Sequence, residues 1–339
     1  MSKGLRHFPE LDAVFECAQQ AAGLGRVSEE AIVRYRHHDF PILSIEFGSQ
    51  EKGVPTLVFV GGVHGLEKVG TEVVISYLRS FIRLLRWDES TQNIMDRCRL
   101  VFYPLANPVG MFRRTRSNGK GVDIMRNSKI DAGKVKVPIL GGHRISPLLP
   151  WFRGKKGSYE IETRALMEMM TRYLSTSDLV VSLDVHSGFG LVDRLWFPYA
   201  SSSDVFPESH RLLLLKKNLD STYPNHVYVI EPQSVHYTTH GDLWDDLHIA
   251  NAKDQKNTFI PLCLEMGSWA WIRKNPKQAL TGLGLFNPML PHRLARIQRR
   301  HMPLFDFLLR SIYSFKGWSE MSLEKEEYFK EKAKMLWYT

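Results

Sequence analysis

Near-continuous apolar runs recur along the chain, separated by segments whose apolar residues repeat at the spacing of a helix. The clearest runs are TLVFVGGV at 56–63, RLVFYPL at 99–105 and LVVSLD at 179–184. Runs of this kind are typical of strands that are buried on both faces of a sheet. Further strands are predicted at 31–35, 41–47, 194–199, 227–230 and 258–264.

Helical spacing dominates the segments between these runs. In residues 10–23, for example, Leu11, Val14 and Ala18 fall at positions i, i+3 and i+7. The same pattern predicts helices at 67–85, 159–175, 205–223 and 291–314, and a peripheral helix in the charged tail at 319–339. Strands that alternate with helices favour an α/β sheet covered on both faces. Functional residues of such folds lie beyond the carboxyl ends of the strands.

The composition is that of an ordinary globular protein. The 339 residues are 43% hydrophobic and 24% charged, which excludes a disordered, collagenous or coiled-coil chain. No apolar run reaches the roughly 18 residues of a membrane span, and no unbroken apolar stretch follows the basic N-terminus as in a signal peptide. Three cysteines without paired spacing are typical of a reducing compartment. We therefore expect a cytoplasmic protein without a membrane partner.

The formal net charge of +9 is compatible with an acidic partner, such as nucleic acid or an anionic substrate. Spread over this length, it is more simply explained by a solvated surface. The basic clusters at 113–116, 153–156 and 293–300 are short, and no aromatic residues are interleaved with them for base stacking. We expect no nucleic-acid partner, and we take the charge as a modest indication that the substrate is acidic.

Polar residues with metal-binding chemistry follow three of the predicted strands. His64 and Glu67 follow TLVFVGGV, at the junction with a predicted helix. His186 follows LVVSLD, and Glu265 ends TFIPLCL. Imidazole and carboxylate groups bind zinc, and hydrolytic zinc sites use three protein ligands and keep one position open. A carboxylate that ends an apolar run is costly unless it has a partner or a task. The pattern favours a catalytic metal site over a buried structural histidine and a solvated His-Glu pair.

The motifs around these residues resemble the zinc carboxypeptidases of the carboxypeptidase A type. The resemblance extends from about Pro41 to Gly267 and rests on several motifs in order. These motifs are GGVHGLEKVG at 61–70, NPVG at 107–110, FRRTRS at 112–117, GVDIMRN at 121–127, ETRAL at 162–166 and DVHS at 184–187.

The resemblance implies a role for each residue of the site. Zinc (Zn²⁺) would be held by His64, Glu67 and His186. Glu265 would be the general base that takes a proton from the attacking water. Arg113, the first arginine of FRRTRS, would polarise the scissile carbonyl and stabilise the oxyanion.

The same resemblance implies how the substrate is held. Arg126 would bind a substrate carboxylate, Tyr237 would be the family's mobile tyrosine, and the specificity pocket would lie near residues 242–245. Met125 departs from the family pattern, which has an asparagine that helps to hold the carboxylate. A thioether cannot donate a hydrogen bond, so we expect carboxylate recognition to depend on Arg126 and its neighbours.

The implied fold is α/β, with a mixed, mostly eight-stranded sheet between helices. We expect a catalytic domain at 41–315, preceded by a helix and strand at 1–40 and followed by a charged tail at 316–339. The implied activity is hydrolysis of an amide or peptide bond near a substrate carboxylate. The expected partner is therefore a peptide or an acyl-amino-acid.

Three other functions remain open. N-acyl amino acid deacylases of the succinylglutamate desuccinylase and aspartoacylase type share the His-Gly-x-Glu start, although FRRTRS and ETRAL are more similar to the peptidases. A peptidase for muropeptides or γ-glutamyl peptides would suit the change at Met125. A non-catalytic binding protein on the same fold is disfavoured, because all three ligands and the base are present.

Overall fold

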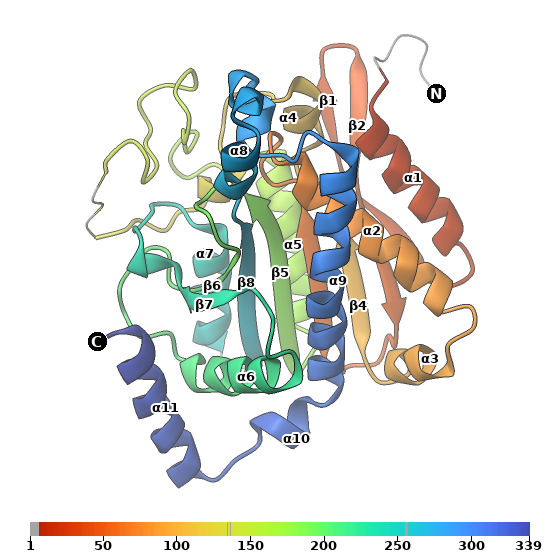
Figure 1. The fold of residues 1–339 in the computed structure, drawn as a ribbon, viewed down its shortest axis with the longest axis vertical. Helices are drawn as coiled ribbons and strands as arrows, with labels where there is room; N and C mark the ends of the chain where they lie inside the picture. Colours follow the sequence, from red (N-terminus) through yellow and green to blue (C-terminus); the bar gives the residue numbers. More distant parts are fainter. Residues whose placement is uncertain (1–6, 134, 136, 255–256) are drawn as a thin grey trace.

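The structure, a computed structural model, describes residues 7–133, 135, 137–254 and 257–339. Its centre is an eight-stranded sheet with helices on both faces, as Figure 1 shows. The strand order is β1-β2-β4-β3-β5-β8-β6-β7. The α/β fold and the mixed eight-stranded sheet expected from the sequence are therefore confirmed.

Parallel strands form the middle of the sheet, an antiparallel hairpin forms one edge, and a parallel pair that runs antiparallel to the middle strands forms the other. The parallel strands are β3 (Thr56–Gly61), β4 (Arg99–Tyr103), β5 (Leu179–Ser187) and β8 (Thr258–Met266). The outer strands are β1 (Arg26–Tyr35), β2 (His38–Gly48), β6 (Arg194–Phe197) and β7 (Val229–Pro232). Every residue of β3, β4 and β5 is buried, which explains why these segments are apolar without alternation.

Two layers of helices enclose the sheet (Figure 1). One face is covered by α1 (Pro9–Ala21), α2 (Lys68–Leu84) and α9 (Pro291–Tyr313), and the other by α5 (Ile161–Leu174) and α7 (Leu243–Asp254). The remaining α-helices are α3 (Glu89–Met95), α4 (Pro108–Arg113), α6 (Ser209–Thr222), α8 (Trp269–Lys274), α10 (Phe315–Ser319) and α11 (Leu323–Trp337). The 3-10 helices are η1 (Ile124–Arg126), η2 (Gln233–Val235), η3 (Pro276–Leu280) and η4 (Gly282–Leu285). Within the described part of the chain, no helix combines the length and apolarity that crossing a membrane requires.

An aromatic cluster anchors the strand that leads into the site. Phe59 of β3 stacks on Phe305 of α9, with ring centroids 4.3 Å apart, and Tyr77 of α2 contacts both rings. All three side chains are buried, and burial stabilises each large apolar side chain by roughly 1.5–3 kcal/mol. The carboxyl end of β3 and the start of α2 are thereby held against one rigid core.

Candidate metal and catalytic site

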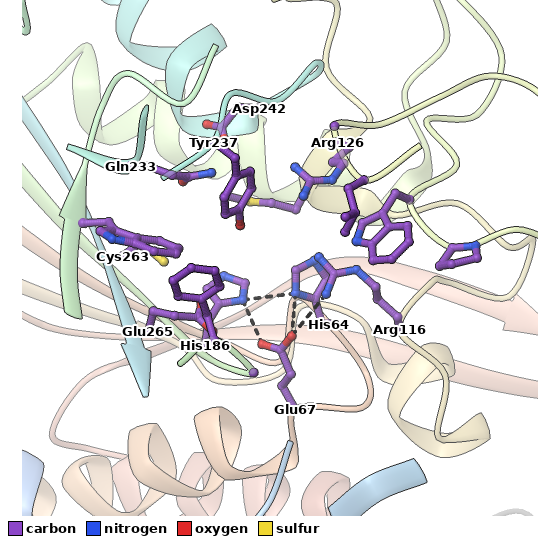
Figure 2. A pocket seen from close by; sticks show the side chains of 18 of the residues that line it. His64, Glu67, Arg116, Arg126, His186, Gln233, Tyr237, Asp242, Cys263 and Glu265 are labelled. Carbon is purple, nitrogen blue, oxygen red and sulfur yellow. Dashed lines mark hydrogen bonds and ion pairs between the residues drawn. The ribbon is translucent and has the colours of Figure 1, made fainter. Parts of the chain in front are cut away.

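Three neighbouring parallel strands bring the predicted metal and catalytic residues to one edge of the sheet. His64 and Glu67 lie in the turn between β3 and α2. His186 and Glu265 are the next-to-last residues of β5 and β8, and they stand opposite each other in the strand register. The structure therefore brings together four residues that are up to about two hundred positions apart in the sequence, as Figure 2 shows.

The three predicted ligands face one another at the spacing of a metal site. His64 Nδ1 lies 3.2 Å from His186 Nδ1 and 3.0 Å from Glu67 Oε1, and His186 Nδ1 lies 3.0 Å from Glu67 Oε2. Ligands bound at about 2.0–2.1 Å in a tetrahedron are separated by roughly 3.3 Å. All three residues are buried and form a candidate metal cluster. The donor set fits zinc.

The second nitrogen of each histidine faces a buried carboxylate. His64 Nε2 lies 3.1 Å from Asp123 Oδ1, and His186 Nε2 lies 2.8 Å from Asp184 Oδ2. A ring that carries its proton on Nε2 presents the Nδ1 lone pair to a metal, and such carboxylates are usual partners of metal-bound histidines. Asp123 and Asp184 lie in motifs quoted from the sequence, but sequence reasoning gave neither of them this role.

Glu67 is held as a carboxylate by its neighbours. Burial would raise the pKa of Glu67, but His64 and His186 hold it below its ordinary value. The backbone N–H of Ser187 also donates a 3.0 Å hydrogen bond to Glu67 Oε2. An ionised carboxylate is the form that binds a cation, so Glu67 does not need to lose a proton in order to bind a metal ion.

The cluster lies at the bottom of a pocket of about 510 Å³ (Figure 2). The long polar stretch between α4 and α5 supplies one wall, including Leu140 and Trp151. The other wall comes from residues that follow β5 and η4, including Phe189 and Phe286. The pocket is large enough for a terminal residue of a peptide and the bond that precedes it.

Glu265 and Tyr237 both line this pocket. Burial, together with the negative charge of Glu67, raises the pKa of Glu265 to about 8. Burial raises the pKa of Tyr237 to about 12, so this phenol keeps its proton at neutral pH. The structure therefore brings both residues to the pocket, and their roles as base and mobile tyrosine stay predictions.

The role predicted for Arg113 is corrected, because the structure does not bring this residue to the pocket. Its Nη1 atom donates a 3.2 Å hydrogen bond to the carbonyl of Gly119, and its exposed guanidinium lies 5.4 Å from the centre of the Tyr35 ring. Helix α4 ends at Arg113, and Arg114 then adopts a left-handed conformation with φ 59° that redirects the chain. Arg116, the last arginine of the same motif, lines the pocket instead.

Arg116 lies directly beside the metal ligands. Its Nε donates a 2.8 Å hydrogen bond to Asp123 Oδ2, and its Nη1 donates to Glu67 Oε1 over 3.4 Å. Only 19% of the side chain is exposed. Sequence reasoning missed this residue although it stood in the right motif, because the spacing of the motif does not reveal which arginine faces inward.

The far side of the pocket contains Arg126, Met125 and Asp242. Arg126 is buried, and its Nε has no hydrogen-bond partner within the described structure. Asp242 immediately precedes α7 and accepts hydrogen bonds from two backbone N–H groups of that helix. Burial and the nearby Asp245 raise the pKa of Asp242 to about 8. The specificity pocket expected near residues 242–245 stays a prediction.

A family model described as zinc carboxypeptidase matches residues 35–270. That is more than half of the chain, so the protein belongs to the zinc carboxypeptidase family. The resemblance seen in the sequence motifs is thereby confirmed. The finer boundaries at residues 41 and 315 stay predictions.

Individual relatives are distant. Carboxypeptidase SOL1 of Arabidopsis thaliana is 30% identical over 91 residues, which cover 26% of this chain and 18% of that protein. Bovine thrombin-activatable fibrinolysis inhibitor, solved with tick carboxypeptidase inhibitor, is 15% identical with a TM-score of 0.58, over 83% of this chain and 96% of that one. Carboxypeptidase A from Helicoverpa armigera is 18% identical with a TM-score of 0.58, over 77% and 64%. At these identities the likeness to solved structures shows the fold.

Proposed function

We propose that this protein is a zinc-dependent carboxypeptidase that hydrolyses an amide bond next to a substrate carboxylate. The observation that carries the proposal is the pocket itself. It contains a buried His-Glu-His cluster, an adjacent glutamate and two arginines that both approach Asp123. A carboxypeptidase needs each of these groups, and a binding protein does not need all of them in one place.

Arg126 is the proposed anchor for the substrate carboxylate. Its guanidinium is buried beside the pocket and its Nε lacks a hydrogen-bond partner among the described residues. A guanidinium is a planar, two-pronged donor that matches a carboxylate. A carboxylate held at Arg126 sets the scissile bond at a fixed distance from the metal ligands.

The chemistry is divided between Glu265 and Arg116. Zinc held by the His-Glu-His cluster would supply a Lewis acid that activates water at neutral pH. Glu265 takes the proton of the attacking water and returns it to the leaving amine. Arg116, beside the ligands, replaces Arg113 in the proposal and stabilises the negative charge that develops on the carbonyl oxygen. Tyr237 keeps its proton and is positioned to donate a hydrogen bond to the substrate.

Met125 supports a second candidate substrate class. This side chain lines the pocket next to Arg126 and offers no donor to a carboxylate. In an acyl-amino-acid, a muropeptide or a γ-glutamyl peptide, the groups next to the carboxylate differ from those at the C-terminus of an ordinary peptide. The acidic substrate suggested by the net charge stays a prediction. Three free cysteines support the further proposal of a cytoplasmic location.

The decisive experiment compares wild-type protein with Glu265→Gln on a mixed library of peptides and acyl-amino-acids. Mass spectrometry identifies the products, and elemental analysis measures bound zinc. We expect wild type to release single C-terminal residues or acyl groups, and the variant to retain zinc while losing all hydrolysis. Glu162→Gln, which removes a buried carboxyl outside the pocket, serves as the matched control and keeps activity.

Two outcomes would overturn the proposal. If wild-type protein binds zinc but releases no product from any library member, the protein is a binding protein and not an enzyme. A fully active Glu265→Gln variant would show that another group is the base.

A further inference from the structure

Two segments of the chain contain no Asp or Glu at all. Residues 132–159 carry six Lys and Arg, and residues 266–305 carry seven. The whole chain has 45 Lys and Arg against 36 Asp and Glu. Outside the two segments there are thus 32 basic and 36 acidic side chains, a net charge of −4. The entire positive surplus of the protein lies in these segments, which we call the rim segments.

Both rim segments border the pocket. Leu140 and Trp151 of the first segment line one side of it, and Phe286 of the second lines the opposite side. The second segment also contains α8, which directly follows the strand that carries Glu265. In Figure 1 the first segment forms the loops at the upper left, and α8 lies at the top of the molecule. The positive surplus therefore lies in segments that border the pocket, with four of its arginines on α9 and the others on the loops and on the stretch around α8.

Five basic side chains of the rim segments are exposed, whereas Arg153 is buried and pairs with Asp131, and Arg300 pairs with Asp193. Arg273, Lys274 and Lys277 are exposed, as are Lys155 and Lys156. Within the described residues, none of these five has an acidic partner. Surface cations elsewhere in the fold are commonly paired with a carboxylate. An unpaired group of cations requires an anionic partner or solvent.

Large apolar side chains are also exposed in the two rim segments. Leu148 is 93% exposed and Leu280 is 89% exposed, and Ile145 and Trp269 are 73% and 51% exposed. Leu148 and Ile145 belong to the first rim segment, and the other two belong to the second. Exposed apolar groups that alternate with Lys and Arg, with tryptophan among them, are typical of surfaces that sit in the headgroup region of a membrane.

In place of the sequence-based expectation of no membrane partner, we propose that the rim segments dock on an anionic lipid surface, with the mouth of the pocket facing the membrane. An acidic polypeptide or nucleic acid would neutralise the cations but leave Leu148 and Leu280 in water. A lipid surface satisfies both, because anionic headgroups pair with the cations and the acyl boundary takes the apolar side chains. Docking does not depend on hydrolysis. If the proposed hydrolysis is also correct, its substrates are presented at the membrane surface.

Vesicle co-sedimentation tests this proposal without using activity. We expect full-length protein to bind vesicles of phosphatidylcholine with phosphatidylglycerol, to bind phosphatidylcholine alone weakly, and to lose binding at high salt. Each cation removed near the surface lowers binding about fivefold, so Lys274→Glu with Lys277→Glu weakens it by more than about tenfold. Leu148→Ser with Leu280→Ser weakens binding as well.

Matched controls lie at the other end of the molecule, on α11 at the lower left of Figure 1. Leu323 is 82% exposed there, and Lys332 and Lys334 are exposed cations. Leu323→Ser, and Lys332→Glu with Lys334→Glu, leave vesicle binding unchanged. Thermal unfolding of every variant checks that these exposed substitutions keep the fold.

Three outcomes would overturn the proposal. The first is wild-type protein that stays in the supernatant with anionic vesicles, and the second is an equal loss of binding in the rim and control variants. Binding to heparin that matches vesicle binding and ignores Leu148→Ser with Leu280→Ser would assign the rim to a soluble polyanion. Because none of these measurements uses catalysis, their failure is separate from failure of the proposed function.

Discussion

Asp123 links a metal ligand to the two arginines of the pocket. Its Oδ1 lies 3.1 Å from His64 Nε2, and its Oδ2 accepts a 2.8 Å hydrogen bond from Arg116 Nε. Arg126 Nε lies 3.8 Å from the same Oδ2. Burial would raise the pKa of Asp123, but these three neighbours hold it well below its usual range. One ionised carboxylate therefore orients His64 and lies close to both guanidinium groups.

Two of the three arginines of FRRTRS, Arg113 and Arg116, are expected to differ sharply in their effect on catalysis. Arg116→Ala removes a cation beside the reacting carbonyl, and loss of one such stabilising group lowers kcat by about 10²–10³. Arg113→Ala removes an exposed side chain that contacts Gly119 and Tyr35, so kcat changes little. Steady-state kinetics on the best substrate of the library measures both variants, with zinc content as a check on the site. Equal losses in the two variants would contradict the assignment.

At the scale of elements, the long regular segments could be predicted and the short ones could not. The strands β3, β5 and β8 are almost fully buried, so their sequences are mostly apolar and indicate where His64, His186 and Glu265 emerge. Helices α4 and α8 have six residues each, too few for a helical repeat to stand out. The direction of Arg116 depends on the end of α4, which explains why the motif alone pointed to Arg113.

The packing of α1 on α2 predicts a pH dependence of stability. Burial raises the pKa of Glu72 on α2 to about 7, with Lys68 opposing the shift and Glu10 adding to it. The native protein therefore holds this proton more tightly than the unfolded chain, whose glutamate has a pKa near 4.5. The contribution of Glu72 to the free energy of unfolding is therefore fully present below about pH 4.5 and is lost as the pH rises through 7.

Glu72→Gln is thus expected to raise Tm at pH 8 and to change it far less at pH 5. Thermal unfolding of wild type and variant across this range gives the difference directly. Glu89→Gln, which changes an exposed carboxyl at the start of α3, is the matched control and shows a flat difference. A gain in Tm from Glu72→Gln that is the same at both pH values would show that the charge of Glu72 is not responsible.

At the scale of the whole molecule, the candidate metal site joins parts of the chain that are distant in sequence. His64 and Glu67 belong to the β3–α2 junction, and His186 belongs to β5. Asp123, which orients His64, comes from the long stretch before η1 that also forms the pocket wall. A bound ion would therefore tie the centre of the sheet to the loops that cover its edge, and binding would be linked to the stability of the fold.

Zinc is accordingly expected to raise the Tm of the whole protein. A ligand that binds only the native state at a thousandfold excess over its Kd stabilises by about 4 kcal/mol, which for a large domain corresponds to a rise of roughly 10 °C. Protein stripped with a chelator is expected to melt lower and to recover on addition of Zn²⁺, and His186→Asn is expected to lose most of that recovery. His226→Asn changes a half-buried histidine that pairs with Asp220 away from the pocket, and it keeps the full rise. If Zn²⁺ raises the Tm of His186→Asn as much as that of wild type, the stabilising ion binds elsewhere on the protein.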